Sequence, residues 1–167
     1  KLVYLLIKNK INEIEKNNQI SKVKNELIDF IFFNNGKLND KKIISKSLLD
    51  IVVSSYSSSD QNVLNYNFLL FYVSLARIID NENDRAVLIK GELFQNLKQD
   101  KTAEKNFLLI LPNSPYYLDA QISLAVNYSN ILPYDIALKK IKKIIENNNN
   151  HYSLNKILAD FYRVKKK

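Results

Sequence analysis

The sequence contains no cysteine, no methionine and no tryptophan, and its 167 residues include only two glycines, three prolines and one histidine. Without cysteine the chain has no disulfide, no thiolate nucleophile and no cysteine-based metal site. Two glycines are too few for a glycine-rich phosphate loop, and so few turn-forming residues argue against the many hairpins of a β-sandwich. Because methionine is missing even at position 1, we expect Lys1 to begin a fragment or a processed chain.

What the sequence does contain is typical of a helical globular domain. Hydrophobic residues make up 46% of the chain and charged residues 25%, which allows a real core within one continuous domain. The net charge of +8 is unevenly distributed: residues 1–59 carry +4, residues 60–133 carry −2 and residues 134–167 carry +6. We therefore expect any anionic partner to bind near the C-terminus. The longest early apolar run, residues 2–7, is far shorter than the ~20 residues that span a bilayer, and we read it as the start of an amphipathic helix rather than as the stub of a signal segment.

Apolar residues recur every three or four positions along almost the whole chain, which is the helical period. The expected helices are an N-terminal one with Val3, Ile7, Ile11 and Ile14 on one face; a second with Val23, Leu27 and Ile31, ended by Gly36; a third capped by Asp40, with Ile44, Leu48, Ile51 and Val52 facing inward; a fourth from Asp60 to about Ile79; and five more at residues 84–96, 101–111, 115–130, 133–146 and 152–164. The serine-rich stretch at residues 54–60 is predicted to be a linker between the third and fourth helices. Ser114 is expected to cap its helix, with Pro115 at the first helical position.

A pattern with a period of 34 residues runs through the second half of the chain. The positions that align are, in first helices, Gly91, Ala125 and Ala159, then Phe94, Tyr128 and Tyr162; in second helices, Leu69, Ala103 and Ala137, then Val73, Phe107 and Ile141, then Ala76, Ile110 and Ile144; and in the turns, Asn81, Pro115 and Asn149. A small residue lets the partner helix approach closely, and the aromatic residue fills the gap between adjacent hairpins. The alternative is a generic helical bundle in which the echo at 34 residues arose by chance.

This pattern resembles the tetratricopeptide repeat (TPR), a helix hairpin of 34 residues. The resemblance implies an all-α, right-handed α-solenoid of antiparallel helix hairpins with about nine helices. Its expected divisions are N-terminal hairpins without a clear repeat at residues 1–60, then repeats at residues 61–83 (partial), 84–117, 118–151 and 152–167 (a half repeat or capping helix). The sequence departs from the family at the large first-helix position, which holds Val87, Gln121 and Asn155 instead of tryptophan, and Lys90 replaces the usual leucine. The stretch "LPNSPYYLDAQISLAVNY" is also similar to repeats of bacterial envelope TPR proteins, so the resemblance favours a periplasmic or membrane-associated location over a cytoplasmic one.

In the family, partner peptides bind along the concave face formed by the first helices. The corresponding residues are Arg85, Leu88, Ile89, Glu92 and Gln95 in one repeat, Asp119, Ile122, Ser123, Val126 and Asn130 in the next, and Ser153, Lys156, Ile157 and Asp160 in the last. The clamp with which chaperone-type members hold a terminal carboxylate is missing from these positions. What remains is an apolar strip with mixed charge at its rim, so we expect a non-enzymatic scaffold or adaptor that binds a peptide or amphipathic helix of a partner protein. The alternative occupant of the strip is another part of the same protein.

A second hypothesis concerns the lysine-rich helix of residues 133–146. Lys139, Lys140, Lys142 and Lys143 surround the inward-facing Ile141 and Ile144. These lysines are either a solvated face or an anionic contact for a membrane surface or a nucleic acid. No aromatic residues interleave with them as a stacking platform would require, so nucleic acid is the weaker alternative.

Nothing in the sequence indicates catalysis, and we expect no cofactor. Asp80, Glu82 and Asp84 have the alternation of a calcium loop, but Arg85 and Gly91 stand where such a loop needs glycine and glutamate. We therefore expect a turn between helices there. His151, the single histidine, lies in a polar stretch without a second ligand at metal spacing, and we expect it to be a turn residue.

Overall fold

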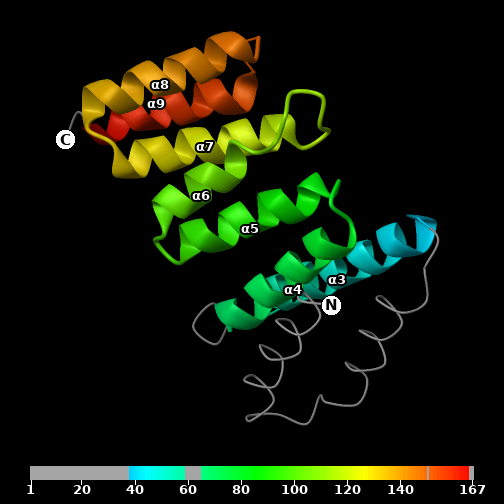
Figure 1. Cartoon of the computed structure of the whole chain (residues 1–167). Coiled ribbons are helices and arrows are strands. Elements are labelled where there is room, and N and C mark those ends of the chain that lie inside the picture. The colour runs from blue at the N-terminus through cyan, green and yellow to red at the C-terminus, as the bar shows by residue number, and fades with distance from the viewer. Residues whose placement is uncertain (1–37, 59–64, 150, 166–167) are drawn as a thin grey trace. The chain divides into compact units, whose positions relative to one another are not determined.

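The computed structural model describes residues 38–58, 65–149 and 151–165, and in these residues it contains seven helices and no strand (Figure 1). The all-α prediction is confirmed for this part of the chain. The first two expected helices, Gly36 and the expected cap Asp60 lie outside the described residues. The chain divides into two compact units, Lys1–Ile44 and Ser45–Lys167. Except for residues 38–44, the described part of the chain belongs to the second unit.

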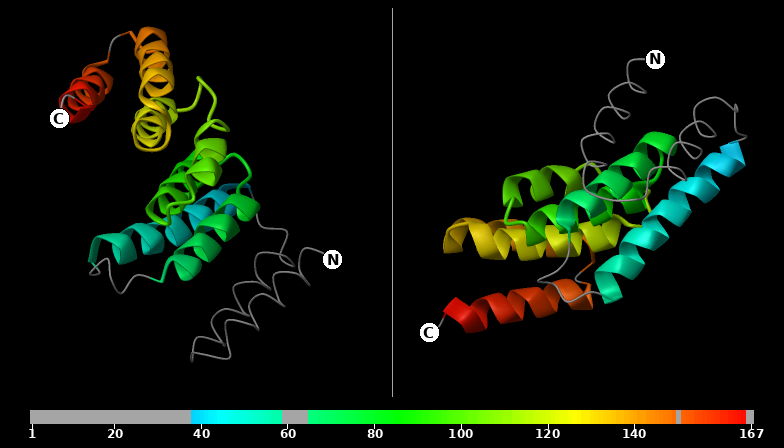
Figure 2. Two further views of the ribbon diagram at one scale, coloured as in Figure 1. Left: turned by 90° about the vertical axis from the view of Figure 1, so that its left-hand side faces the viewer. Right: turned by 90° about the horizontal axis from the view of Figure 1, so that it is seen from below.

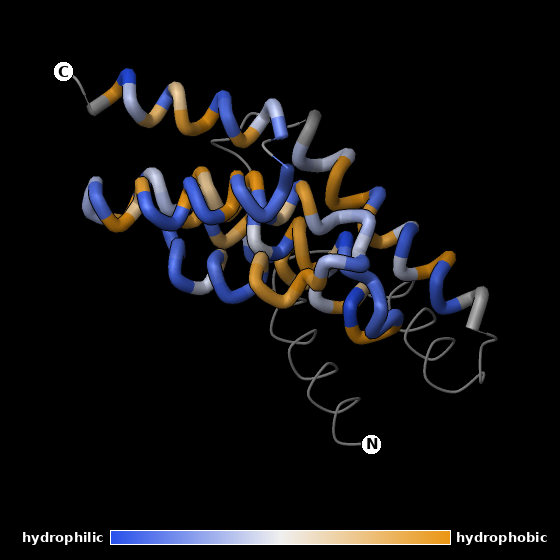
Figure 3. The backbone as a smooth tube through the Cα atoms, turned by 90° about the horizontal axis from the view of Figure 1, so that it is seen from above, coloured by the Kyte–Doolittle hydropathy of each residue, from blue (hydrophilic) through white to orange (hydrophobic). Residues whose placement is uncertain are grey.

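The helices are α3 (Leu38–Ser58), α4 (Tyr66–Ile79), α5 (Asp84–Asn96), α6 (Asp100–Phe107), α7 (Tyr117–Ile131), α8 (Tyr134–Asn147) and α9 (Tyr152–Lys165). The predicted bounds of α5 are correct at both ends, and those of α8 and α9 differ from the structure by one residue. Hydrophobic and hydrophilic residues alternate around these helices (Figure 3), as expected of helices that bury one face.

Several expectations about α3 and α4 are wrong. The serine-rich stretch is helical up to Ser58 rather than a linker, because α3 continues to that residue. Asp40 lies inside α3 rather than at its cap, and Ile51 is exposed, whereas Leu49 is fully buried. Helix α4 begins at Tyr66, where the Asn65 side chain accepts a hydrogen bond from the Phe68 N–H at 3.2 Å.

The connection between α6 and α7 is longer than predicted. Helix α6 ends at Phe107 rather than at residue 111, and α7 begins at Tyr117 rather than at Pro115. Ser114 does not cap α7. Its hydroxyl oxygen accepts from the Tyr116 N–H at 3.2 Å, and its carbonyl accepts from the Tyr117 N–H at 3.1 Å, so it forms a turn before the helix.

Helices of the second unit pack in two ways (Figure 2). From α4 to α9 each helix contacts the next, and in addition α5 contacts α7 and α7 contacts α9. Side-chain hydrogen bonds join α3 to α5 as well, from Asn96 to Tyr56 (2.8 Å) and from Arg85 to Asp50 (3.2 Å). The odd-numbered helices α3, α5, α7 and α9 therefore form one row of neighbours, which we call the odd-helix row.

Burial in the core follows the 34-residue register. All nine aligned second-helix residues are buried, namely Leu69, Val73 and Ala76 of α4, Ala103, Phe107 and Ile110 of α6 and its following turn, and Ala137, Ile141 and Ile144 of α8. In the first helices Gly91 and Ala125 are buried, but Ala159 is exposed, because no described helix packs beyond α9. In α4, α6 with its following turn, and α8, the repeat in sequence is thus also a repeat in burial.

Gly91 shows why this register needs a small residue. A Cβ atom at Gly91 would overlap Cε1 of the Phe107 ring and lie 2.8 Å from its Cδ1. Because Phe107 is fully buried, its ring has little room to move away. The glycine therefore lets α6 approach α5 closely.

A buried polar link joins α3 to the turn between α4 and α5. The Ser45 hydroxyl donates to the Ala76 carbonyl at 2.8 Å and accepts from the Asn83 side-chain amide at 2.7 Å. The Asn83 side-chain oxygen in turn accepts from the Ala86 N–H at 3.1 Å, which caps α5. One serine thereby aligns three helices, since buried polar groups need their partners in place.

Candidate functional site: the odd-helix row

The first hollow of the odd-helix row lies between α3 and α5. Its volume is about 150 Å³, and it is lined by Val52, Val53, Tyr56, Ile89, Glu92 and Leu93. At its edge the Tyr56 hydroxyl accepts a hydrogen bond from the Asn96 amide, and burial raises the pKa of this phenol. Apolar walls with a few polar groups at the rim are typical of a surface that accepts an apolar side chain.

An ion pair spans the same two helices. A guanidinium nitrogen of Arg85 lies 3.2 Å from the Asp50 carboxylate, and both side chains are partly exposed. Such exposed pairs contribute little to stability, so the pair mainly fixes the positions of the two charges. Of the predicted groove residues, Arg85 is therefore already engaged within the chain.

The second hollow lies between α7 and α9. Its volume is about 230 Å³, and it is lined by Val126, Ser129, Asn130, Ile157, Asp160, Phe161 and Val164. The structure thus brings together four predicted groove residues, Val126 and Asn130 from α7 with Ile157 and Asp160 from α9. Asp160 accepts a hydrogen bond from Arg163 at 2.7 Å, which partly neutralises its charge.

Two carboxylates of the row have no compensating cation among the described residues. Glu92 lines the first hollow and Asp119 lies in the first turn of α7, and no ion pair or hydrogen bond of either carboxylate occurs in this part of the chain. Although the Glu92 side chain is exposed overall, desolvation at the hollow raises the pKa of its carboxyl, and the charge of Asp119 raises it further. This part of the row therefore favours a cation.

The remaining predicted groove residues differ in how accessible they are. Leu88 cannot contribute to a surface strip, because it is buried in the core beside Val87. Ile122 and Ser123 of α7 are half-buried, and Lys156 of α9 is exposed. Gln95 is half-buried, with an amide nitrogen that has no hydrogen-bond partner among the described residues.

Sequence reasoning missed the residues that α3 contributes. Val52, Val53 and Tyr56 line the first hollow, but Tyr56 lies in the serine-rich stretch that we expected to be a linker. The helical spacing of Leu48, Val52 and Tyr56 is the signal that could have extended the helix through those serines.

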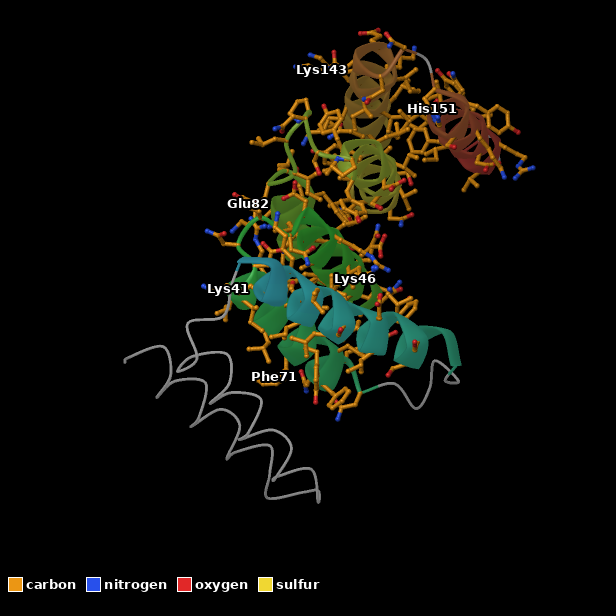
Figure 4. The ribbon with its side chains drawn as sticks, turned by 90° about the vertical axis from the view of Figure 1, so that its right-hand side faces the viewer. Lys41, Lys46, Phe71, Glu82, Lys143 and His151 are labelled. Atoms are coloured by element: carbon orange, nitrogen blue, oxygen red, sulfur yellow. The ribbon has the colours of Figure 1, made fainter. Side chains whose placement is uncertain are left out.

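The lysine-rich helix α8 separates into exposed lysines and one engaged lysine. Lys139, Lys142 and Lys143 are exposed, and Figure 4 shows Lys143 near one end of α8. Lys140 instead lies 3.4 Å from the Glu104 carboxylate and 4.1 Å from the centre of the Tyr128 ring. Tyr128 donates its hydroxyl proton to the same carboxylate at 2.9 Å, and burial together with this acceptor strongly raises the pKa of the phenol. Lys140 therefore helps to join α6, α7 and α8.

The acidic turn and His151 both belong to connections between helices (Figure 4 labels Glu82 and His151). Asp80 ends α4 and accepts from the Glu82 N–H at 3.2 Å, while Asp84 begins α5 and lies 3.7 Å from Arg77. His151 directly precedes α9 and accepts from the Ser153 N–H at 3.4 Å. Both turn predictions are confirmed. In the part of the chain that the structure describes, no three His, Asp or Glu side chains gather as they would around a metal ion.

Comparison with known proteins adds no relative. No protein-family model matches the chain, and no curated protein matches its sequence. None of the described helices has the length and apolar character needed to cross a bilayer.

Proposed function

We propose that this chain is a non-enzymatic binding module that holds a segment of a partner protein along the odd-helix row. The observation that carries the proposal is that two apolar hollows open on this row, one between α3 and α5 and one between α7 and α9. Surface hollows with apolar walls are the usual anchor points for the side chains of a bound segment. A segment that spans both hollows would lie across α5 and α7.

The repeat supports the same proposal. Burial of the aligned residues in α4, α6 and α8, with contacts from α5 to α7 and from α7 to α9, is what a TPR-like solenoid requires. We therefore propose that the hairpins continue as a right-handed α-solenoid whose first helices provide the binding face. Proteins built from stacked hairpins use such faces for partner binding.

The charges of the row indicate the chemistry of the partner. Because Glu92 and Asp119 have no cation among the described residues, a partner with a lysine or arginine between two apolar anchors would complete the site. The preferred segment is amphipathic, with apolar residues for the two hollows and a basic residue opposite α5 and the start of α7.

A random peptide library selected against the full chain tests the proposal. We expect the selected peptides to combine apolar residues with at least one basic residue. Peptide affinity should fall at least tenfold when Ile89 or Val126 is replaced by lysine, because a charge then enters an apolar hollow. Ile78→Lys on α4 is the matched control, since this exposed isoleucine lies outside the row.

The outcome against the proposal is equally definite. Peptides that bind Ile89→Lys and Val126→Lys as tightly as the wild type, with the helical content intact by circular dichroism, would show that the odd-helix row is not the site. Charge reversal with Glu92→Lys and Asp119→Lys should shift the selected peptides from basic to acidic.

A second candidate function uses α8, because Lys139, Lys142 and Lys143 are exposed on it. In this alternative the module docks on an anionic membrane or a nucleic acid. Salt distinguishes the two candidates, since lysine-driven binding falls steeply with ionic strength whereas binding in apolar hollows does not.

A further inference from the structure

The turn that follows α6 exposes three leucines within four residues. Leu108, Leu109 and Leu111 are 56%, 64% and 61% exposed, whereas Ile110 between them is 2% exposed and belongs to the core. We call residues 108–111 the leucine loop. Three leucine side chains exposed to water within four residues are unfavourable, and such a cluster usually marks a contact surface.

The leucine loop is held in place by its backbone. The Leu108 N–H donates to the Glu104 carbonyl (3.0 Å), the Leu109 N–H donates to the Asn106 carbonyl (3.1 Å), and the Leu111 carbonyl accepts from the Ser114 N–H (2.9 Å). With Ile110 buried as an anchor, the leucines are presented in a fixed arrangement. A surface of this kind needs little further ordering when it binds.

Exposed lysines lie on α6, the helix that precedes the leucine loop. Lys101 and Lys105 of α6 are exposed and four residues apart, so they share one side of the helix that leads into the loop. Glu104 is directed instead to Tyr128 and Lys140, and Asp100, the other acid of α6, is at its first residue, two turns from the loop. The exposed charges of α6, the helix that leads into the loop, are therefore positive.

We propose that the leucine loop, with Lys101 and Lys105, docks this chain on an anionic membrane surface. The leucines enter the boundary between headgroups and acyl chains, and the two lysines contact acidic headgroups. Lysine beside apolar residues favours a membrane over a protein partner, because the cores of protein interfaces are depleted in lysine. This surface belongs to α6 and its following turn, and it leaves both hollows of the odd-helix row free for the binding function proposed above.

Vesicle flotation of the full chain tests the proposal. We expect the chain to float with vesicles of phosphatidylcholine that contain about one quarter phosphatidylserine, and to float far less with phosphatidylcholine alone. Replacing Leu108, Leu109 and Leu111 together by serine should lower partitioning by roughly tenfold or more, since the apolar contact is lost. Lys101→Glu with Lys105→Glu should lower it by roughly tenfold, and only on the vesicles that contain phosphatidylserine.

Matched controls make the outcome decisive. Ile136→Ser and Ile78→Ser remove exposed isoleucines of α8 and α4, and both variants should float like the wild type. Absence of wild-type flotation, or equal flotation of the triple leucine variant, would overturn the proposal. Sedimentation could also overturn the proposal. If the wild type self-associates without binding vesicles while the leucine variant is monomeric, a second copy of the chain covers the loop. Nucleic-acid binding that is lost in the double lysine variant but kept in the leucine variant would also count against it.

Discussion

Substitution of Gly91 by alanine tests the close packing of α5 against α6. In a solvated helix this change stabilises the protein by about 1 kcal/mol, because glycine is a poor helix former. Here the added Cβ overlaps the Phe107 ring, and the ring is fully buried. Overpacking of this kind costs about 1–3 kcal/mol beyond any gain, so we expect a net loss of about 1–2 kcal/mol and a melting temperature lower by roughly 3–8 °C.

Urea denaturation followed by far-ultraviolet circular dichroism measures this loss, with an unchanged dependence on urea as the sign of an intact fold. The control is the same substitution in a Phe107→Leu background. Phe107→Leu alone costs about 1–2 kcal/mol for the space it leaves, but in that background Gly91→Ala should be neutral or stabilising. The two changes should therefore couple by about 1–3 kcal/mol. A Gly91→Ala protein that is more stable than the wild type would refute the packing argument.

Three further predictions concern a helix end, the repeat register and a carboxyl group. Lys98 lies just beyond the C-terminal end of α5 and has a positive φ of 59°, so Lys98→Gly should stabilise the protein by about 0.5–1 kcal/mol. Asn149→Gly, at a φ of 52°, should stabilise it by less, since asparagine tolerates this conformation. Equal effects of the two substitutions in thermal melts would contradict this reason. Ala125→Leu should lower the free energy of unfolding by about 2 kcal/mol or more, because Ala125 is buried. The equivalent Ala159→Leu should change it by less than about 0.5 kcal/mol, because Ala159 is exposed. Similar losses of stability for both variants in urea titrations would count against the register. Desolvation, and then the charge of Asp119, raise the pKa of Glu92 above its ordinary value of 4.5. The stabilisation that Glu92 contributes is therefore fully present below pH 4.5, and it is lost as the pH rises through the higher pKa of the folded state. Asp119→Asn should lower that pKa in an NMR titration, and an unchanged titration would show that the two carboxyls do not interact.

Local sequence patterns predicted the helices well where polar residues mark the ends. Asn83 caps α5 and the acidic turn separates it from α4, so residues 84–96 were predictable to the residue. The prediction failed where composition and packing disagree. Leucines 108, 109 and 111 resemble core residues, and this resemblance extended α6 in error, although only Ile110 of this run is buried.

The candidate site was partly predictable for a similar reason. Repeat offsets predicted Ile89, Val126 and Ile157 on the first helices of the hairpins, and all three line the hollows of the odd-helix row. Ile89 and Ile157 occupy equivalent repeat positions, whereas Val126 occupies the position that holds Glu92 and Asp160 in the neighbouring hairpins. The same offsets cannot distinguish Leu88, which is buried, from its half-buried neighbour Ile89, since the rotation of a helix by a fraction of a turn depends on tertiary packing. The engagement of Lys140 with Glu104 likewise depends on two helices whose contacting residues are 36 positions apart in sequence.

Photo-crosslinking from defined positions tests the central claim most directly. A photoreactive amino acid at Ile89 in one protein and at Val126 in another, each present in full-length chain in cells of the source organism, should capture the same partner, because one bound segment crosses both hollows. The same group at Ile78 of α4 or Lys142 of α8 should not capture it. Capture only from Ile78 or Lys142, or of unrelated proteins from Ile89 and Val126, would contradict binding along the odd-helix row.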